Sequence, residues 1–110
     1  MIIVTTEEIS GTTVKKHLGL VRGNTIRARH LGHDIMALFR NIVGGEIRDY
    51  TKMMAEAREQ AIDRMVREAE ALGANAILAV RFSTSEMMHG AAEIIVYGTA
   101  AIVEEVGAKP

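Results

Sequence analysis

A single apolar stripe through residues 46–72 constrains the fold of this chain more than any other feature. Apolar side chains recur there at intervals of three and four residues, which is the spacing of one face of an α-helix. The stripe consists of Ile47, Tyr50, Met54, Ala57, Ala61, Met65, Ala69 and Leu72. Its centre is mostly alanine, so the predicted helix can lie close against a sheet. Gly73 predicts the C-terminal cap, and Asp63 and Arg67 have the (i, i+4) spacing of an ion pair.

A shorter helix is predicted before the long one. Asp34 is a suitable N-cap, and the apolar residues Ile35, Leu38, Phe39 and Ile42 follow it at helical spacing. Gly44 and Gly45 then end this helix, because glycine readily adopts the left-handed conformation that closes a helix. We interpret the two glycines as a corner between helices, since no G-x-G-x-x-G or G-x-x-x-x-G-K-[ST] pattern surrounds them.

Two strands are predicted in the N-terminal part of the chain. Residues Ile2–Thr5 form a short β-branched run that ends at acidic residues. Residues Val14–Arg29 form a longer run of strand-like composition. Gly19 and Gly23 interrupt this run and predict a bend or a bulge.

Two further strands are predicted at residues 74–84 and 92–106, with a hairpin connection at residues 85–90. Both strands carry apolar residues on their two faces, so both faces must be covered. A helical layer covers only one of these faces. We therefore expect either the short helix or a neighbouring subunit to cover the other.

The order of these elements, β-β-α-α-β-β, predicts an α+β domain. In this fold a small, mostly antiparallel sheet carries one long and one short helix packed on one face. We expect a single domain over residues 1–106 and a C-terminal tail over residues 107–110.

Composition narrows the classes of function. The 13 lysines and arginines nearly balance the 14 aspartates and glutamates, which argues against generic binding to nucleic acid or an anionic membrane. The absence of cysteine excludes disulfides, thiolate metal sites and a cysteine nucleophile. The N-terminus lacks the pattern of a signal peptide, and no segment has the length of a membrane span. We expect a cytoplasmic protein.

Several segments resemble the YbjQ family, a set of small proteins labelled as heavy-metal-binding. These segments are "VTTEEISG", "GLVRGNTI", "NIVGGEIRDYTKMMAEAREQA", "EAEALGANAILAVRF" and "VYGTAAIV". The resemblance covers nearly the whole chain and implies a YbjQ- or dodecin-like fold assembled into a ring-shaped homopentamer. It matches Gly44, Gly45, Gly73 and Gly98 to structural glycines of the family. It supplies no catalytic or metal-binding residues, and the family more often has arginine where His33 stands.

Three histidines are the candidate metal ligands. His30 and His33 have the H-x-x-H spacing, and an (i, i+3) pair at the start of a helix can converge on one ion. His89 follows two methionines, and thioethers beside an imidazole suit a soft cation such as Cu(I). A ring of subunits would supply further copies of such groups. The candidate cofactor is a divalent transition metal ion.

Each pattern also has a simpler and commoner explanation. His30 and His33 can belong to an exposed polar segment in which Asp34 caps the short helix. Met87 or Met88 can fill a gap at a subunit boundary. Arg58 can bind an anion between subunits, although a carboxylate across the interface is the better partner for its guanidinium. His17, among lysines in a strand, is interpreted as a surface residue.

Two hypotheses of function follow. The first is a homo-oligomeric protein, expected as a pentamer, that binds heavy or transition metal ions. The second is a non-enzymatic oligomeric scaffold or small-ligand-binding module with sites between subunits. An enzyme is the least supported class, because neither G-x-S-x-G nor H-E-x-x-H is present and no acid–base pair follows from spacing.

Overall fold

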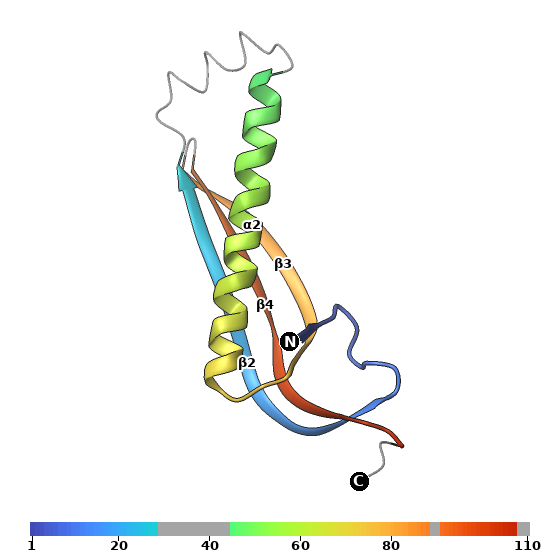
Figure 1. Ribbon diagram of the computed structural model, residues 1–110. Coiled ribbons are helices and arrows are strands. Elements are labelled where there is room, and N and C mark those ends of the chain that lie inside the picture. Colours follow the sequence, from blue (N-terminus) through green and yellow to red (C-terminus); the bar gives the residue numbers. More distant parts are fainter. Residues whose placement is uncertain (29–44, 89–90, 108–110) are drawn as a thin grey trace.

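The computed structural model describes residues 1–28, 45–88 and 91–107 (Figure 1). The elements are β1 (Ile2–Ile3), β2 (Thr12–Ala28), α2 (Gly45–Ala71), β3 (Ala76–Met88) and β4 (Ala91–Glu105). The strands form one sheet of four strands in the order β1-β3-β4-β2. β1 runs parallel to β3, and the other two pairings are antiparallel. The sheet is therefore mixed but mostly antiparallel.

The α+β class is confirmed, but the predicted order β-β-α-α-β-β is not matched. Over the three described ranges the order is β-β-α-β-β, with α2 as the single helix. The segment predicted to hold the short helix, residues 34–44, lies outside these ranges. The long helix begins at Gly45, one residue before the predicted start.

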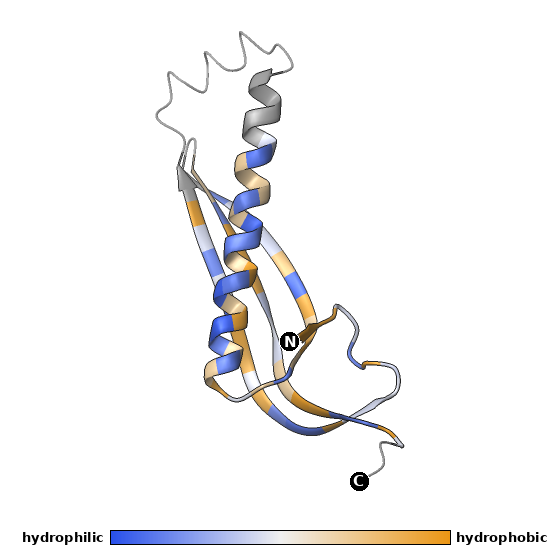
Figure 2. Cartoon of the chain, viewed as in Figure 1, coloured by the Kyte–Doolittle hydropathy of each residue, from blue (hydrophilic) through white to orange (hydrophobic). Residues whose placement is uncertain are grey.

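The alanine-rich stripe of α2 packs on the sheet as predicted. Ala57, Ala61, Met65 and Ala69 are completely buried. They form one core with Val21 of β2 and with Ile94, Val96 and Ala100 of β4. Figure 1 shows α2 lying along β2 and β4, with β3 to one side. The side of α2 that faces the viewer is largely hydrophilic in Figure 2, as expected for a helix with one buried face.

Gly23 allows this close packing. A β-carbon at Gly23 would collide with the carbonyl oxygen of Ala61 and lie 2.6 Å from the backbone nitrogen of Met65. No bulge occurs at Gly23, because the β2–β4 register continues through it without a shift. The bulge predicted at Gly19 is confirmed by a register shift between His17 and Gly19. Gly19 also has a φ of 113°.

The C-terminus of α2 is closed by Gly73. This residue has a φ of 85°, which glycine adopts without steric cost. The amide of Ala74 donates to the carbonyl oxygen of Ala69 at 3.1 Å, and the amide of Gly73 donates to the carbonyl oxygen of Glu70 at 3.0 Å. These two bonds form a Schellman motif, so the predicted cap is confirmed. Leu72 lies outside the helix and is 47% exposed, so its assignment to the buried stripe is wrong.

Side chains of α2 also reach the outer edge of the sheet, which is formed by β2. The backbone amide of Arg22 donates to a carboxylate oxygen of Glu68 at 3.3 Å. Nη1 of Arg64 donates to the carbonyl oxygen of Asn24 at 2.6 Å. Below the helix, the hydroxyl of the buried Thr25 donates to the carbonyl oxygen of Ala57 at 3.0 Å. All three bonds fix α2 along β2, and the first two satisfy backbone groups of β2 that the β2–β4 ladder leaves unpaired.

Among the described residues, those that cover the face of the sheet opposite α2 lie at one end of it. Ala76, Leu78, Ala101 and Val103 form a second buried cluster there, against which Val4, Ile9 and Val14 pack. The chain between β1 and β2 thus supplies part of the cover that the sequence led us to expect from a helix or a neighbour. The remainder of this face carries exposed side chains.

Candidate functional site

The three candidate metal ligands, His30, His33 and His89, lie outside the described residues. Their predicted role therefore stays a prediction. Within the ranges 1–28, 45–88 and 91–107, no group of three or more histidines and carboxylates is placed to hold a metal ion. His17 is exposed on β2, as predicted for a surface residue. No helix in the same ranges is long and apolar enough to cross a membrane.

A β-bulge in β3 is the most distinctive backbone feature near the covered end of the sheet. Leu78 pairs with Thr99 and Arg81 pairs with Tyr97, so β3 has one residue more than β4 between these two pairs. Within the bulge, Ala79 adopts a φ of 53°. This left-handed conformation costs a non-glycine residue about 1–2 kcal/mol. The amide of Ala79 donates to the carbonyl oxygen of Thr6 at 2.8 Å, which holds the bulge to the N-terminal segment.

The extra residue decides which side chains face α2. Successive side chains of a strand alternate between the two faces, and a shift of one residue reverses the alternation. Ile77 and Val80 both belong to the core beneath α2, although three positions separate them. Arg81 consequently projects to the opposite face, on the same side as Tyr97. The bulge therefore keeps Val80 buried and puts a guanidinium on the uncovered side of the sheet.

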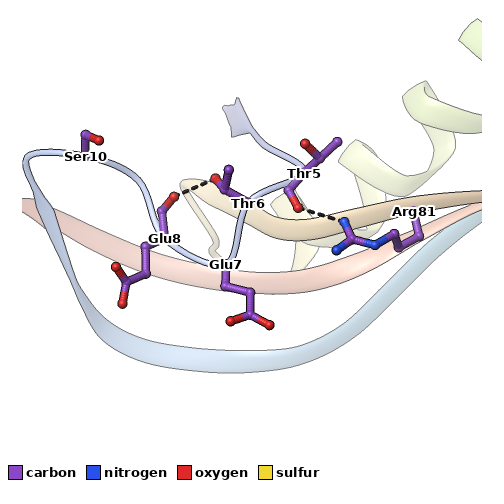
Figure 3. Close-up of a pocket in the computed structure, with 6 residues that line it drawn as sticks. All are labelled: Thr5, Thr6, Glu7, Glu8, Ser10 and Arg81. Atoms are coloured by element: carbon purple, nitrogen blue, oxygen red, sulfur yellow. Dashed lines mark hydrogen bonds between the residues drawn. The ribbon is translucent and has the colours of Figure 1, made fainter.

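Arg81 borders a hollow of about 680 Å³ between β3 and the N-terminal segment (Figure 3). The other lining residues are Thr5, Thr6, Glu7, Glu8 and Ser10. Nη1 of Arg81 donates to the carbonyl oxygens of Thr5 at 2.7 Å and of Val80 at 2.9 Å. The hydroxyl of Thr6 donates to the carbonyl oxygen of Glu8 at 2.6 Å. These bonds hold the Arg81 and Thr6 side chains in place, and none of them involves the carboxylate of Glu7 or Glu8.

The chemistry of the hollow is limited. All six lining residues are exposed, so water screens the two carboxylates and the guanidinium. Two carboxylates offer too few ligands for a tight metal site, and the arginine beside them opposes a cation. The hollow pairs no nucleophile with a general base. It can contact a small polar molecule, but it does not define a reaction.

Beyond the N-terminal segment, the face opposite α2 carries apolar and basic side chains together with Asn24, whose Nδ2 donates to a carboxylate oxygen of Glu93 at 3.2 Å. Directly opposed residues on neighbouring strands project to the same face. Arg22 of β2, Tyr97 of β4 and Arg81 of β3 therefore form one row across the sheet. Leu20 is 64% exposed, Ile26 52% and Tyr97 39%. We use the term open face for the surface made by Leu20, Arg22, Ile26, Arg81, Ile95 and Tyr97.

Sequence reasoning identified none of Arg22, Arg81 and Tyr97 as functional candidates. The alternation of Arg22 and Asn24 with Val21, Gly23 and Thr25 was a usable signal, because it places the polar residues on one face of β2. Their alignment with Tyr97 depends on register between distant strands. That register is not readable from local pattern.

Comparison with known proteins places these features in a family. Residues 1–104 match the family described as "Putative heavy-metal-binding". A UPF0145 protein of Clostridioides difficile is 56% identical over 105 residues, covering 96% of this chain and 94% of the relative. A UPF0145 protein of Dehalococcoides mccartyi is 59% identical over 104 residues, covering 94% of this chain and all of the relative. The names of these relatives state no activity.

A solved structure shares the fold. It is a protein of unknown function of the DUF74 family from Pediococcus pentosaceus, with a TM-score of 0.63 and 18% identity. The match covers 94% of this chain and 98% of that one. The resemblance of the sequence to the YbjQ proteins is thus confirmed over nearly its whole length, and the chain belongs to the YbjQ family.

Proposed function

We propose that this protein is the non-enzymatic subunit of a homo-oligomer and that five copies close into a ring. The observation that carries this proposal is the exposure of the apolar side chains of the open face. The ring of five follows from the resemblance of the sequence to the YbjQ proteins.

Three large apolar side chains of the open face are well exposed. Leu20 is 64% exposed, Ile26 52% and Tyr97 39%. Apolar side chains gathered on one face of a folded protein mark a site of protein–protein contact.

Native mass spectrometry of the untagged protein tests the proposal. Five copies of 12.0 kDa give an expected mass of 60 kDa. The measurement is made at micromolar protein and repeated on dilution, because an oligomer dissociates by mass action. A mass of 12.0 kDa throughout this range would refute self-association. A stable assembly of another size would refute only the number five.

Metal binding is a second candidate, favoured by the description of the family. The described residues do not fit a metal site by themselves, because they contain no group of three ligating side chains. The proposed ligands are therefore His30, His33 and His89, with copies from neighbouring subunits completing the coordination. A divalent transition metal ion suits imidazole donors.

Thermal unfolding with Zn²⁺, Ni²⁺ or Cu²⁺ tests this candidate. A metal at one hundred times its dissociation constant stabilises the folded state by about 2.7 kcal/mol. For a domain of this size that free energy raises the Tm by roughly 10 °C. Replacing His30, His33 and His89 by alanine should abolish the rise, whereas His17→Ala is the matched control and should retain it. Absence of a rise with all three metals would exclude a metal site of this kind.

A further inference from the structure

We propose that residues 1–8, which we call the N-terminal strap, open and close as one unit together with the bulge of β3. In the closed state, which the structure shows, the strap lies along β3. In the open state it leaves β3 while the rest of the fold stays intact. Strain at Ala79 favours opening, and the hydrogen bond from Arg81 to the strap opposes it. The movement lies within one chain, so the inference does not depend on the proposed assembly.

Backbone hydrogen bonds hold the strap along β3 as far as the bulge. Their lengths lie between 2.8 and 3.1 Å. They run from the amide of Ile2 to Asn75, of Val4 to Ile77, of Val80 to Val4 and of Ala79 to Thr6. Because the last two bonds are donated by the bulge, release of the strap leaves the amides of the bulge without these acceptors.

Little apolar burial supports these bonds. Among residues 1–8, all of which the structure describes, Val4 alone is partly buried and the others are exposed. Val4 packs against the second buried cluster of the sheet. A region with few buried apolar contacts and with exposed backbone hydrogen bonds opens at a lower free energy than the core does. The strap therefore opens more readily than α2, whose buried stripe includes Ala61 and Met65.

The strap ends where the chain is fixed again to the sheet. The carbonyl oxygen of Ile9 accepts hydrogen bonds from the amide and the hydroxyl of Thr12, at 3.1 and 2.8 Å. The carbonyl oxygen of Gly11 accepts one from the amide of Val106 at 2.8 Å. Residues from Ile9 onward therefore stay with β2 and β4 when the strap leaves.

The strain that favours opening lies at Ala79. Its φ of 53° is in the left-handed region, which is costly for a residue with a β-carbon. The hydrogen bonds that Ala79 and Val80 donate to the strap hold the bulge in this conformation. When the strap leaves, Ala79 is free to adopt an ordinary strand conformation. Part of the free energy needed to break the bonds is thereby returned.

Arg81 opposes opening from the position after the bulge. Its Nη1 donates to the carbonyl oxygen of Thr5 in the strap at 2.7 Å (Figure 3). The same nitrogen donates to the carbonyl oxygen of Val80 at 2.9 Å, which keeps the guanidinium beside the strap. Hydrogen bonds from a charged donor are stronger than those between neutral groups. The irregularity that strains Ala79 thus also places the side chain that closes the strap.

Opening changes the surface in two ways. It uncovers the part of the second buried cluster against which Val4 packs. It also removes the hollow beside Arg81, because four of the lining residues belong to the strap, namely Thr5, Thr6, Glu7 and Glu8. A small polar molecule bound in the hollow would therefore favour the closed state.

Amide hydrogen exchange, resolved to single residues and measured on the native protein at one concentration, tests the shared opening. The amides of Val4, Ala79 and Val80 should have one common protection factor, because one opening releases all three. This factor should be at least about tenfold below that of Met65 in α2. Different protection factors for Val4 and Ala79, or protection equal to that of Met65, would overturn the proposal.

Two variants and a matched control test the roles of the two residues. Arg81→Ala should lower the protection of Val4 and Ala79 about tenfold, because a hydrogen bond from a charged group is lost. Arg22→Ala removes the same side chain from the same row of the sheet and should leave this protection unchanged. Equal effects of the two substitutions would refute the closing role of Arg81.

The variant Ala79→Gly tests the strain. Glycine adopts a positive φ without steric cost, so the closed state is no longer strained. The protection of Val4 and Val80 should rise about threefold, since the greater freedom of glycine in the open state offsets part of the gain. Unchanged or lower protection in this variant would show that strain at Ala79 does not favour opening.

Discussion

Substitution of Gly23 by alanine tests the packing of α2 on the sheet most directly. The backbone of Gly23 lies outside the left-handed region, so alanine is compatible with its conformation. At such a site, replacing glycine by alanine normally stabilises a protein by about 0.4–1 kcal/mol, because the unfolded chain loses freedom. Without a steric conflict, Gly23→Ala would therefore raise the Tm.

The structure predicts the opposite sign. The added β-carbon would collide with the carbonyl oxygen of Ala61 and approach the nitrogen of Met65 to 2.6 Å. Both atoms belong to the helix backbone, so no side-chain rotation relieves the conflict. The helix must move outward and lose contact along its alanine stripe. Overpacking of this kind costs about 3 kcal/mol at the upper end of the usual range, which exceeds the gain from the unfolded state.

A net loss of about 2–3 kcal/mol should lower the Tm by roughly 10 °C. Circular dichroism at one fixed protein concentration measures this change, because dissociation would otherwise contribute to it. Gly98→Ala is the graded control and should lose about half as much. Its added β-carbon would lie 2.8 and 3.0 Å from the Cγ2 methyls of Ile77 and Val80 and 2.9 Å from the carbonyl oxygen of Leu78, and all three distances exceed the approach to the Ala61 oxygen at Gly23. An unchanged or raised Tm for Gly23→Ala would refute the packing argument.

Three further predictions follow from single contacts. Gly73→Ala should destabilise the protein by about 1–2 kcal/mol in urea unfolding, because its φ of 85° is costly for alanine; an unchanged midpoint would contradict the cap. Asp63→Ala should lower the free energy of unfolding in urea by less than about 0.5 kcal/mol, because its ion pair with Arg67 is exposed. A larger loss would contradict the assignment of this pair as a weak surface contact. Arg81→Ala should speed amide exchange in the N-terminal segment, since the bond to the carbonyl oxygen of Thr5 is lost; unchanged exchange would refute this anchoring role.

The sequence predicts those parts of the fold that depend on local pattern. The period of the α2 stripe extends over many turns, so the helix, its buried alanines and the Gly73 cap follow from it. The contact of Gly23 with the helix was not predicted, because glycine serves bends, bulges and close approaches, and only the position of the facing helix distinguishes them. The open face was missed because it depends on pairing between strands distant in sequence.

The bulge at Ala79 left no sequence signal that could have been used. The run from Ala76 to Val80 is apolar throughout, so an inserted residue does not disturb any polar alternation. The consequence is visible only at Arg81, whose charge appears on the side of the sheet opposite to α2. The side on which this residue projects therefore depends on a backbone irregularity.

The bonds from Glu68 and Arg64 to the edge of β2 make it harder for strands of other molecules to pair with this edge. A strand of 17 residues at the edge of a sheet presents unpaired backbone N–H and C=O groups. Strands of other molecules can pair with these groups and form a fibril. Here an incoming strand would have to displace a carboxylate and a guanidinium from the amide of Arg22 and the carbonyl of Asn24. The helix thereby protects this edge against the addition of further strands.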